Sequence, residues 1–175
     1  MDIKQFDGRK LLVVGGTSGI GLEVAQMVAE QGGAVVVVGN RPEKAEVARQ
    51  QLAAVAGEGK AAAFAADLSN PASVQTLLAK LAAEHSDIDL LVNTAGIFYP
   101  KAFLEHSIED YNNFLDLNRS LFFITQQVAA SLIAQKKPGS IVNVTAVAAR
   151  QAIETVTAPG YSMGKMGLDG MARHV

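Results

Sequence analysis

A glycine-rich stretch near the N-terminus reads Val14-Gly15-Gly16-Thr17-Ser18-Gly19-Ile20-Gly21. It follows an apolar run at residues 11–14, which predicts a strand, and it opens a segment at residues 19–30 with the periodicity of a helix. At such a turn, glycines permit a tight bend and a close approach of backbone N–H groups to a pyrophosphate, and the helix N-terminus favours negative charge. An ordinary strand-to-helix connection is the alternative, but this placement favours dinucleotide binding.

The rest of the chain repeats the alternation of short β-branched runs and longer amphipathic segments. Further strands are expected at residues 34–38, 61–65, 89–92 and 141–145. Further helices are expected at residues 43–56, 72–84 and 107–135, and from residue 160 to the end of the chain. We expect Ser69-Asn70-Pro71 to cap the third helix and the long fourth helix to be interrupted near Asn118. This pattern is typical of βα units around a parallel sheet in one domain, residues 1–175.

Composition excludes several classes of protein. Hydrophobic residues make up 49% of the 175, and the mean hydropathy of +0.20 excludes a disordered chain. A net charge of -2 argues against a nucleic-acid partner, and the absence of cysteine excludes disulfides and thiolate metal ligands.

The three histidines are far apart in sequence, so we expect no metal site. The start of the chain lacks a signal-peptide pattern, and no apolar run reaches the roughly 18 residues of a membrane helix, so we expect a cytoplasmic protein without membrane association.

The glycine spacing carries a family resemblance. Gly15, Gly19 and Gly21 form Gly-x-x-x-Gly-x-Gly, which resembles the short-chain dehydrogenase/reductase family more than the Gly-x-Gly-x-x-Gly fingerprint. Further motifs follow in the family's order: Asp67-Leu68, Asn93-Thr94-Ala95-Gly96, Asn118 and Tyr161-Ser162-Met163-Gly164-Lys165. The chain departs from the family pattern at Val14, where Thr is usual, and at Thr94, where Asn is usual.

The resemblance implies a fold and a cofactor site. The implied fold is a doubly wound, three-layer α/β/α sheet of the Rossmann type with strand order 3-2-1-4-5. The implied cofactor contacts are Gly15, Thr17, Ser18, Gly19, Ile20, Gly21, Asn40, Arg41, Asp67, Leu68, Asn93, Ala95, Gly96, Tyr161 and Lys165. Within this set Asp67 borders the adenine pocket, with a helix cap as its alternative role. Asn93 has the alternative of holding strand backbones together.

The residues after the second strand bear on cofactor preference. Val38-Gly39-Asn40-Arg41 contains no Asp or Glu, the residue type with which an NAD-specific protein binds the ribose diol. Arg41, helped by Asn40, could bind a 2′-phosphate bidentately. The sequence therefore predicts NADP over NAD. In the alternative interpretation, Arg41 is only a solvated residue before Pro42.

Tyr161 and Lys165 are four residues apart and therefore share one face of a helix. An ammonium group beside a phenol favours the phenolate. The resemblance implies that Tyr161 exchanges a proton with a carbonyl or secondary alcohol, that Lys165 holds the nicotinamide ribose, and that Asn118 connects Lys165 to solvent through a water. A Tyr and a Lys at this spacing are common on helix surfaces, and Asn118 alone could simply kink its helix.

One residue of the family pattern is absent. Alignment of the fifth strand places Ala146 where the family has a catalytic Ser, and loss of one such donor typically costs about 10²- to 10³-fold in rate. The Thr145 hydroxyl would take the place of the missing serine hydroxyl only if the strand end bends, because successive side chains of a strand point to opposite faces. Thr155 or Thr157, in a segment about two residues longer than usual, could also supply a hydroxyl.

Three functions remain open. The first is an NAD(P)-dependent oxidoreductase that transfers a hydride between the nicotinamide and a small-molecule carbonyl or secondary alcohol. The second is a truncated, weakly active or inactive nucleotide-binding remnant, and the third is a structural subunit. The resemblance implies a homo-oligomer, dimer or tetramer, built on the last two helices. Because the family continues beyond this last helix, we expect the chain to be a fragment that lacks the residues most responsible for substrate choice.

Overall fold

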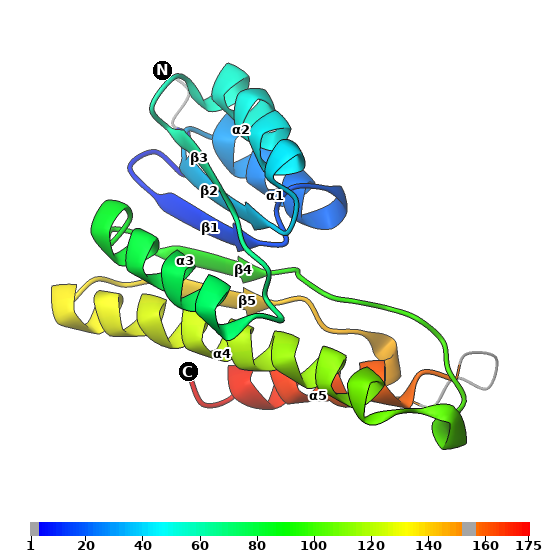
Figure 1. Ribbon diagram of the computed structural model, residues 1–175. Helices are drawn as coiled ribbons and strands as arrows, with labels where there is room; N and C mark the ends of the chain where they lie inside the picture. The colour runs from blue at the N-terminus through cyan, green and yellow to red at the C-terminus, as the bar shows by residue number, and fades with distance from the viewer. Residues whose placement is uncertain (1–3, 152–156) are drawn as a thin grey trace.

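The computed structural model of the chain describes residues 4–151 and 157–175. A five-stranded parallel sheet forms its centre, with the order β3-β2-β1-β4-β5 (Figure 1). Its strands are β1 (Lys10–Val14), β2 (Ala34–Gly39), β3 (Ala61–Ala65), β4 (Leu90–Asn93) and β5 (Ser140–Asn143). Its helices are α1 (Gly19–Glu30), α2 (Pro42–Ala56), α3 (Pro71–Glu84), α4 (Ile108–Gln135) and α5 (Pro159–Ala172), with short 3₁₀ turns η1 (Phe103–Glu105) and η2 (Val147–Ala149). The predicted fold class and strand order are confirmed.

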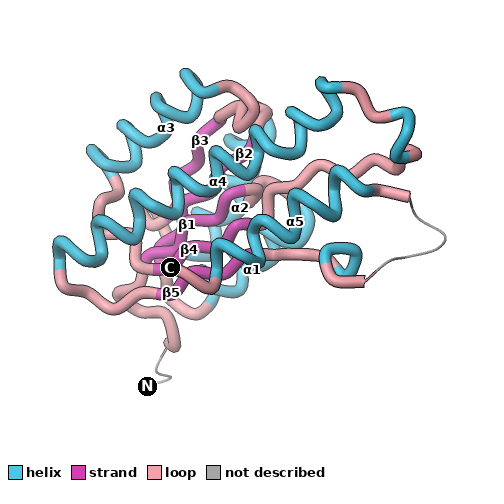
Figure 2. Tube along the Cα trace, turned by 90° about the horizontal axis from the view of Figure 1, so that it is seen from below, coloured by secondary structure: helices cyan, strands magenta, loops and turns pink. Residues whose placement is uncertain are grey.

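Helices cover both faces of this sheet. In Figure 1, α1 and α2 lie over one face, while α3, α4 and α5 lie over the other; Figure 2 shows the second group side by side. The central strand β1 is buried on both sides, with Leu11 and Val13 packed toward the α1 and α2 side and Leu12 and Val14 packed toward the other. Continuous β-branched runs form strands here because both of their faces are covered.

The long helix α4 differs from the prediction. The structure shows one continuous helix of 28 residues, so the expected interruption near Asn118 is wrong. The Asn118 side chain donates a hydrogen bond to the carbonyl of Gly164 in α5 rather than competing for backbone groups of its own helix. A capping box between Ser107 and Asp110 fixes the start of α4.

The boundaries of other elements also differ from the prediction. The last helix ends at Ala172, so the expectation that it continues to Val175 is wrong. Strand β5 ends at Asn143, two residues before the predicted end, which places Thr145 outside the strand. Strand β4 begins and ends one residue later than expected. The predicted cap of α3 is confirmed, because the Asn70 side chain accepts hydrogen bonds from the backbone N–H groups of Ala72 and Ser73.

All strands point the same way, so their carboxyl ends meet at one edge of the sheet. A buried side-chain contact holds two of these ends together. Nδ2 of Asn93 in β4 donates to Oδ1 of Asn143 in β5 at 2.8 Å and to the Thr125 hydroxyl in α4 at 3.0 Å. This contact supports the role predicted as the alternative for Asn93, the joining of neighbouring strands.

Candidate functional site

The glycine-rich turn between β1 and α1 is a tightly packed cradle. Gly15 has a φ of +91°, and a Cβ there would lie 2.6 Å from the backbone nitrogen of Ala95. A Cβ on Gly21 would lie only 2.3 Å from the carbonyl oxygen of Gly15. Side chains at these two positions would displace backbone atoms, so this turn requires glycine at both.

Thr94 completes this cradle, although it departs from the family pattern. Its hydroxyl donates to the carbonyl of Val14 at 2.9 Å, and the same oxygen lies within 2.7 Å of the space that a Cβ on Gly15 or Gly21 would occupy. The loop after β4 therefore closes directly on the turn after β1. Sequence reasoning treated Thr94 only as a substitution and missed this contact, because the two residues joined by the bond are 80 positions apart.

The N-terminus of α1 is open to a ligand. Ser18, the N-cap residue, has extended backbone angles and makes no side-chain hydrogen bond to the helix. Gly19 has a φ of +55° with open space around it, and the Ile20 side chain is 65% exposed. Uncapped N–H groups at a helix N-terminus bind anions, so this turn fits the phosphates of a dinucleotide.

The carboxyl end of β2 packs against the same turn. A Cβ on Gly39 would lie 2.3 Å from the hydroxyl oxygen of Thr17, so the Thr17 side chain occupies the space above Gly39. Asn40 and Arg41 follow and are both exposed. Arg41 is the N-cap residue of α2, and its side chain makes no hydrogen bond to that helix. An exposed guanidinium group thus directly follows the end of β2.

Asp67 and Leu68 lie in the turn between β3 and α3. The Asp67 carboxylate accepts hydrogen bonds from the backbone N–H and the hydroxyl of Ser69 at 2.9 and 2.7 Å. These two bonds hold the pKa of Asp67 below its ordinary value. Asp67 does not cap α3, because Asn70 does so; its carboxylate organises the preceding turn. The Leu68 carbonyl accepts from the Ser120 hydroxyl of α4.

Tyr161 and Lys165 lie one turn apart at the start of α5. The Lys165 ammonium nitrogen is 6.0 Å from the centre of the Tyr161 ring, and it donates to the carbonyl of Val144 after β5 at 2.8 Å. Lys165 is only 7% exposed, and burial lowers its pKa. The predicted shared face is therefore confirmed, and the lysine belongs to the interior rather than to a solvated helix surface.

Gly96 and Asn118 adjoin this pair. A Cβ on Gly96 would lie 3.2 Å from the Lys165 ammonium nitrogen, so the loop after β4 passes directly over the lysine. Nδ2 of Asn118 donates to the carbonyl of Gly164 at 2.7 Å, which ties α4 to the turn of α5 that carries Lys165. A small cavity at this place is lined by Ala95, Gly96, Ile97, Phe114, Leu117, Asn118, Tyr161, Gly164, Lys165 and Leu168.

Sequence reasoning also missed an aromatic residue at this site. The ring of Phe98 meets the ring of Tyr161 edge to face, with 5.0 Å between centroids and 77° between planes. Its signal in the sequence was weak: an aromatic residue two positions after the Asn93-Thr94-Ala95-Gly96 motif. Only the packing of the loop after β4 against α5 brings the two rings together.

Thr145, Thr155 and Thr157 are the candidates for the hydroxyl that Ala146 lacks. Ala146 follows β5 with extended angles, a φ of -147° and a ψ of 154°, and is half-buried. Thr145 precedes it and is also half-buried. Thr157 is exposed, and its carbonyl accepts from the Lys101 N–H at 2.9 Å. Thr155 lies outside the described residues.

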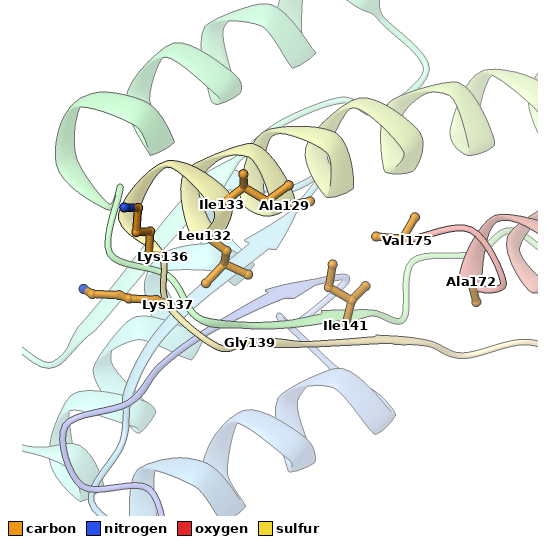
Figure 3. Close-up of a pocket in the computed structure, with 9 residues that line it drawn as sticks. All are labelled: Ala129, Leu132, Ile133, Lys136, Lys137, Gly139, Ile141, Ala172 and Val175. Atoms are coloured by element: carbon orange, nitrogen blue, oxygen red, sulfur yellow. The ribbon is translucent and has the colours of Figure 1, made fainter.

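A separate hollow of about 350 Å³ lies at the amino end of β5, away from these residues (Figure 3). It is lined by Ala129, Leu132, Ile133, Lys136, Lys137, Gly139, Ile141, Ala172 and Val175. Figure 3 shows apolar side chains of α4 and β5 along it, with the two lysine amino groups at one end. It contains none of the predicted site residues.

Two further features of the chain are described for residues 4–151 and 157–175. In this part of the chain, no three or more His, Asp or Glu side chains gather closely enough to hold a metal ion. No helix in the same ranges has the length and apolar character needed to cross a membrane.

Comparison with curated proteins gives relatives across nearly the whole chain. D-threitol dehydrogenase from Mycolicibacterium smegmatis is 33% identical over 169 residues, which are 97% of this chain and 64% of that protein. The 3-oxoacyl-[acyl-carrier-protein] reductase FabG from Chlamydia pneumoniae is 30% identical over 162 residues, which are 92% of this chain and 63% of that protein. The chain thus spans less than two thirds of the length of these relatives.

Solved structures and a family model agree with this result. A gluconate 5-dehydrogenase from Burkholderia cenocepacia, in complex with NADP and tartrate, matches with a TM-score of 0.83 and 30% identity over 97% of this chain and 65% of that one. A putative NAD(P)-dependent gluconate 5-dehydrogenase from Beutenbergia cavernae with bound NADP gives a TM-score of 0.86 and 25% identity over 98% of this chain and 66% of that one. The short chain dehydrogenase family model matches residues 9–175. The chain therefore belongs to the short-chain dehydrogenase/reductase family.

Proposed function

We propose that this chain carries the nucleotide-binding and catalytic part of an NADP-preferring oxidoreductase. The reaction interconverts a small-molecule carbonyl and a secondary alcohol. One observation carries the proposal: the loop after β4 contacts both halves of the site, with Thr94 closing the glycine cradle and Gly96 lying against Lys165. A phosphate-binding turn and the pair of half-buried Tyr161 and buried Lys165 are thereby joined at one sheet edge.

The residues of this edge suit different parts of a dinucleotide. Gly15, Gly19 and Gly21, with the uncapped N-terminus of α1, would hold the pyrophosphate. Asp67 and Leu68 would border the adenine, and Ala95, Gly96 and Lys165 would face the nicotinamide ribose. When bound, the nicotinamide would supply or accept the hydride. The chain itself provides binding, orientation and proton exchange.

Proton exchange is assigned to Tyr161. Its hydroxyl would donate a proton to the oxygen of a carbonyl as that oxygen gains charge, and in the reverse direction its phenolate would accept the proton of an alcohol. The Lys165 ammonium near the ring would stabilise the negative charge that the phenol acquires. Asn118 acts on α5 through the Gly164 carbonyl, so we assign it a positioning role in addition to the proposed water link to Lys165.

The first test is calorimetric titration of the chain with NADPH, followed by NADPH oxidation with a panel of ketones and aldehydes. Binding and turnover are expected. The Gly21→Ala variant is expected to lose at least about tenfold in NADPH affinity, because its Cβ would collide with the carbonyl oxygen of Gly15 and force the cradle open. Gly170→Ala is the matched control, since a Cβ there meets nothing within 4 Å.

Two results, one from the titration and one from the activity assay, would contradict the proposal. Equal affinity of Gly21→Ala and Gly170→Ala for NADPH would mean that the cradle is not the nucleotide site. Binding of NADPH without turnover of any carbonyl would support instead a nucleotide-binding remnant, the alternative that the alanine at position 146 favours.

Arg41 is the basis of the proposed NADP preference. Hydrogen bonds to charged groups contribute about 1.5–3 kcal/mol, so Arg41→Ala is expected to weaken NADPH binding by about 10- to 100-fold. NADH affinity should stay unchanged, because NADH lacks the 2′-phosphate. Calorimetry with each nucleotide measures both values. An equal loss for both nucleotides, or no loss for either, would refute the assignment of Arg41 to the 2′-phosphate.

A further inference from the structure

The segment between Gly96 and α4 makes several contacts with other elements just after Phe98. The ring of Tyr99 packs on that of Phe114 in α4, with centroids 4.9 Å apart and 33° between planes. The Lys101 N–H donates to the Thr157 carbonyl at 2.9 Å, and the Lys101 ammonium pairs with Asp110 at 2.6 Å. The backbone just after Phe98 is therefore held to α4 and to the residue that leads into α5.

Within this segment, Phe98 and Tyr99 make contacts with different helices. Tyr99 packs against α4, whereas Phe98 contacts Tyr161 at the start of α5. The 5.0 Å edge-to-face geometry is a favourable aromatic arrangement. Phe98 nevertheless remains 57% exposed. Phe98 thus presents an exposed aromatic residue beside the proposed proton-transfer residue.

Among the described residues, the Tyr161 ring has different neighbours on different sides. On one side of the Tyr161 ring lies the buried Lys165, which is covered by Gly96. Phe98 is a large apolar residue that both packs on the Tyr161 ring and stays open to solvent. Burying that exposed ring surface under an apolar substituent is favourable, whereas a hydroxylated substituent gains little from it and loses hydration.

We propose that Phe98 is a specificity-determining residue that contacts the substrate. Its exposed ring binds the apolar substituent of a ketone or secondary alcohol whose oxygen approaches Tyr161. The inference rests on the proposed function of Tyr161 and adds a substrate class to it: compounds with an apolar group next to the reacting carbon, in preference to polyhydroxylated ones.

The test compares two ketones, acetophenone and dihydroxyacetone, by the rate of NADPH oxidation. Phe98→Ala is expected to lower the ratio of their kcat/KM values, acetophenone over dihydroxyacetone, by about tenfold, mainly through the KM for acetophenone. Phe98→Tyr keeps the ring and should keep the ratio within about twofold. Phe103→Ala is the matched control, because Phe103 lies in the same segment and is 73% exposed.

The possible outcomes separate the inference from the proposed function. A purely structural role of Phe98 would lower kcat/KM for both ketones equally and leave their ratio unchanged, which would overturn the inference alone. The same conclusion follows if Phe103→Ala changes the ratio as much as Phe98→Ala does. Turnover of dihydroxyacetone but not of acetophenone by the unsubstituted chain, or turnover of other carbonyls of the panel but of neither ketone, would also overturn the inference alone. Absence of turnover with every carbonyl of the panel would overturn the proposed function, and the inference with it.

Discussion

Replacement of Tyr161 by phenylalanine is expected to lower kcat for carbonyl reduction by about 10²- to 10⁴-fold, the usual contribution of a positioned general acid or base. The substitution removes the phenol hydroxyl and keeps the ring that packs against Phe98 and lies near Lys165. NADPH should therefore still bind, and the midpoint of thermal unfolding should change little. Steady-state kinetics and calorimetry on the same preparation measure both properties.

Tyr111→Phe is the control for this substitution. Tyr111 lies on α4, and its side chain is 48% exposed, so loss of its hydroxyl should leave kcat unchanged. If Tyr161→Phe retained kcat, another group would have to exchange the proton, and the proposed role of Tyr161 would be wrong. If it lost NADPH binding and turnover together, the hydroxyl would act in binding rather than in chemistry.

Replacement of Ala146 by serine is expected to raise kcat by about 10²- to 10³-fold, the range that one hydrogen-bond donor to a developing oxyanion typically contributes. Ala146 has extended backbone angles that serine adopts without strain, and its half-buried position leaves a side chain partly accessible. The added hydroxyl would supply the donor that alanine lacks. Single-turnover kinetics at saturating NADPH would measure the gain directly.

Ala146→Cys provides a control of similar size, because a thiol is only a weak hydrogen-bond donor. We expect little or no gain from it. If Ala146→Ser gave no gain either, the site would already contain a donor, and Thr145 or Thr157 would be the next residues to replace. In that case Ala146 would not occupy the position of the family's catalytic serine in this chain.

Much of the fold follows from local sequence patterns. The β-branched run at residues 35–38 forms β2 because both faces of the sheet are covered by helices, a condition that the continuous apolar pattern itself indicates. The cap of α3 at Asn70 was predictable because its side chain bonds to N–H groups only two and three residues away. The Gly15, Gly19 and Gly21 spacing similarly predicted the β1 to α1 turn.

The sequence also indicated which residues belong to the candidate site, because motif order along the chain maps onto strand ends at one sheet edge. Tyr161 and Lys165 were placed on one helix face by their spacing alone. The continuity of α4 was not predictable in this way. Asn118 disfavours a helix locally, but its hydrogen bond to the Gly164 carbonyl of α5 gives its amide a partner outside its own helix.

The sequence by itself therefore determined the element types, the glycine turn and the shared face of Tyr161 and Lys165, because these depend on neighbours within about one helical turn. Only the tertiary structure decided that Lys165 is buried, that Thr94 closes the cradle and that Phe98 packs on Tyr161. These three features join segments that are distant in the chain. They form because the loop after β4 packs against β1 and against α5.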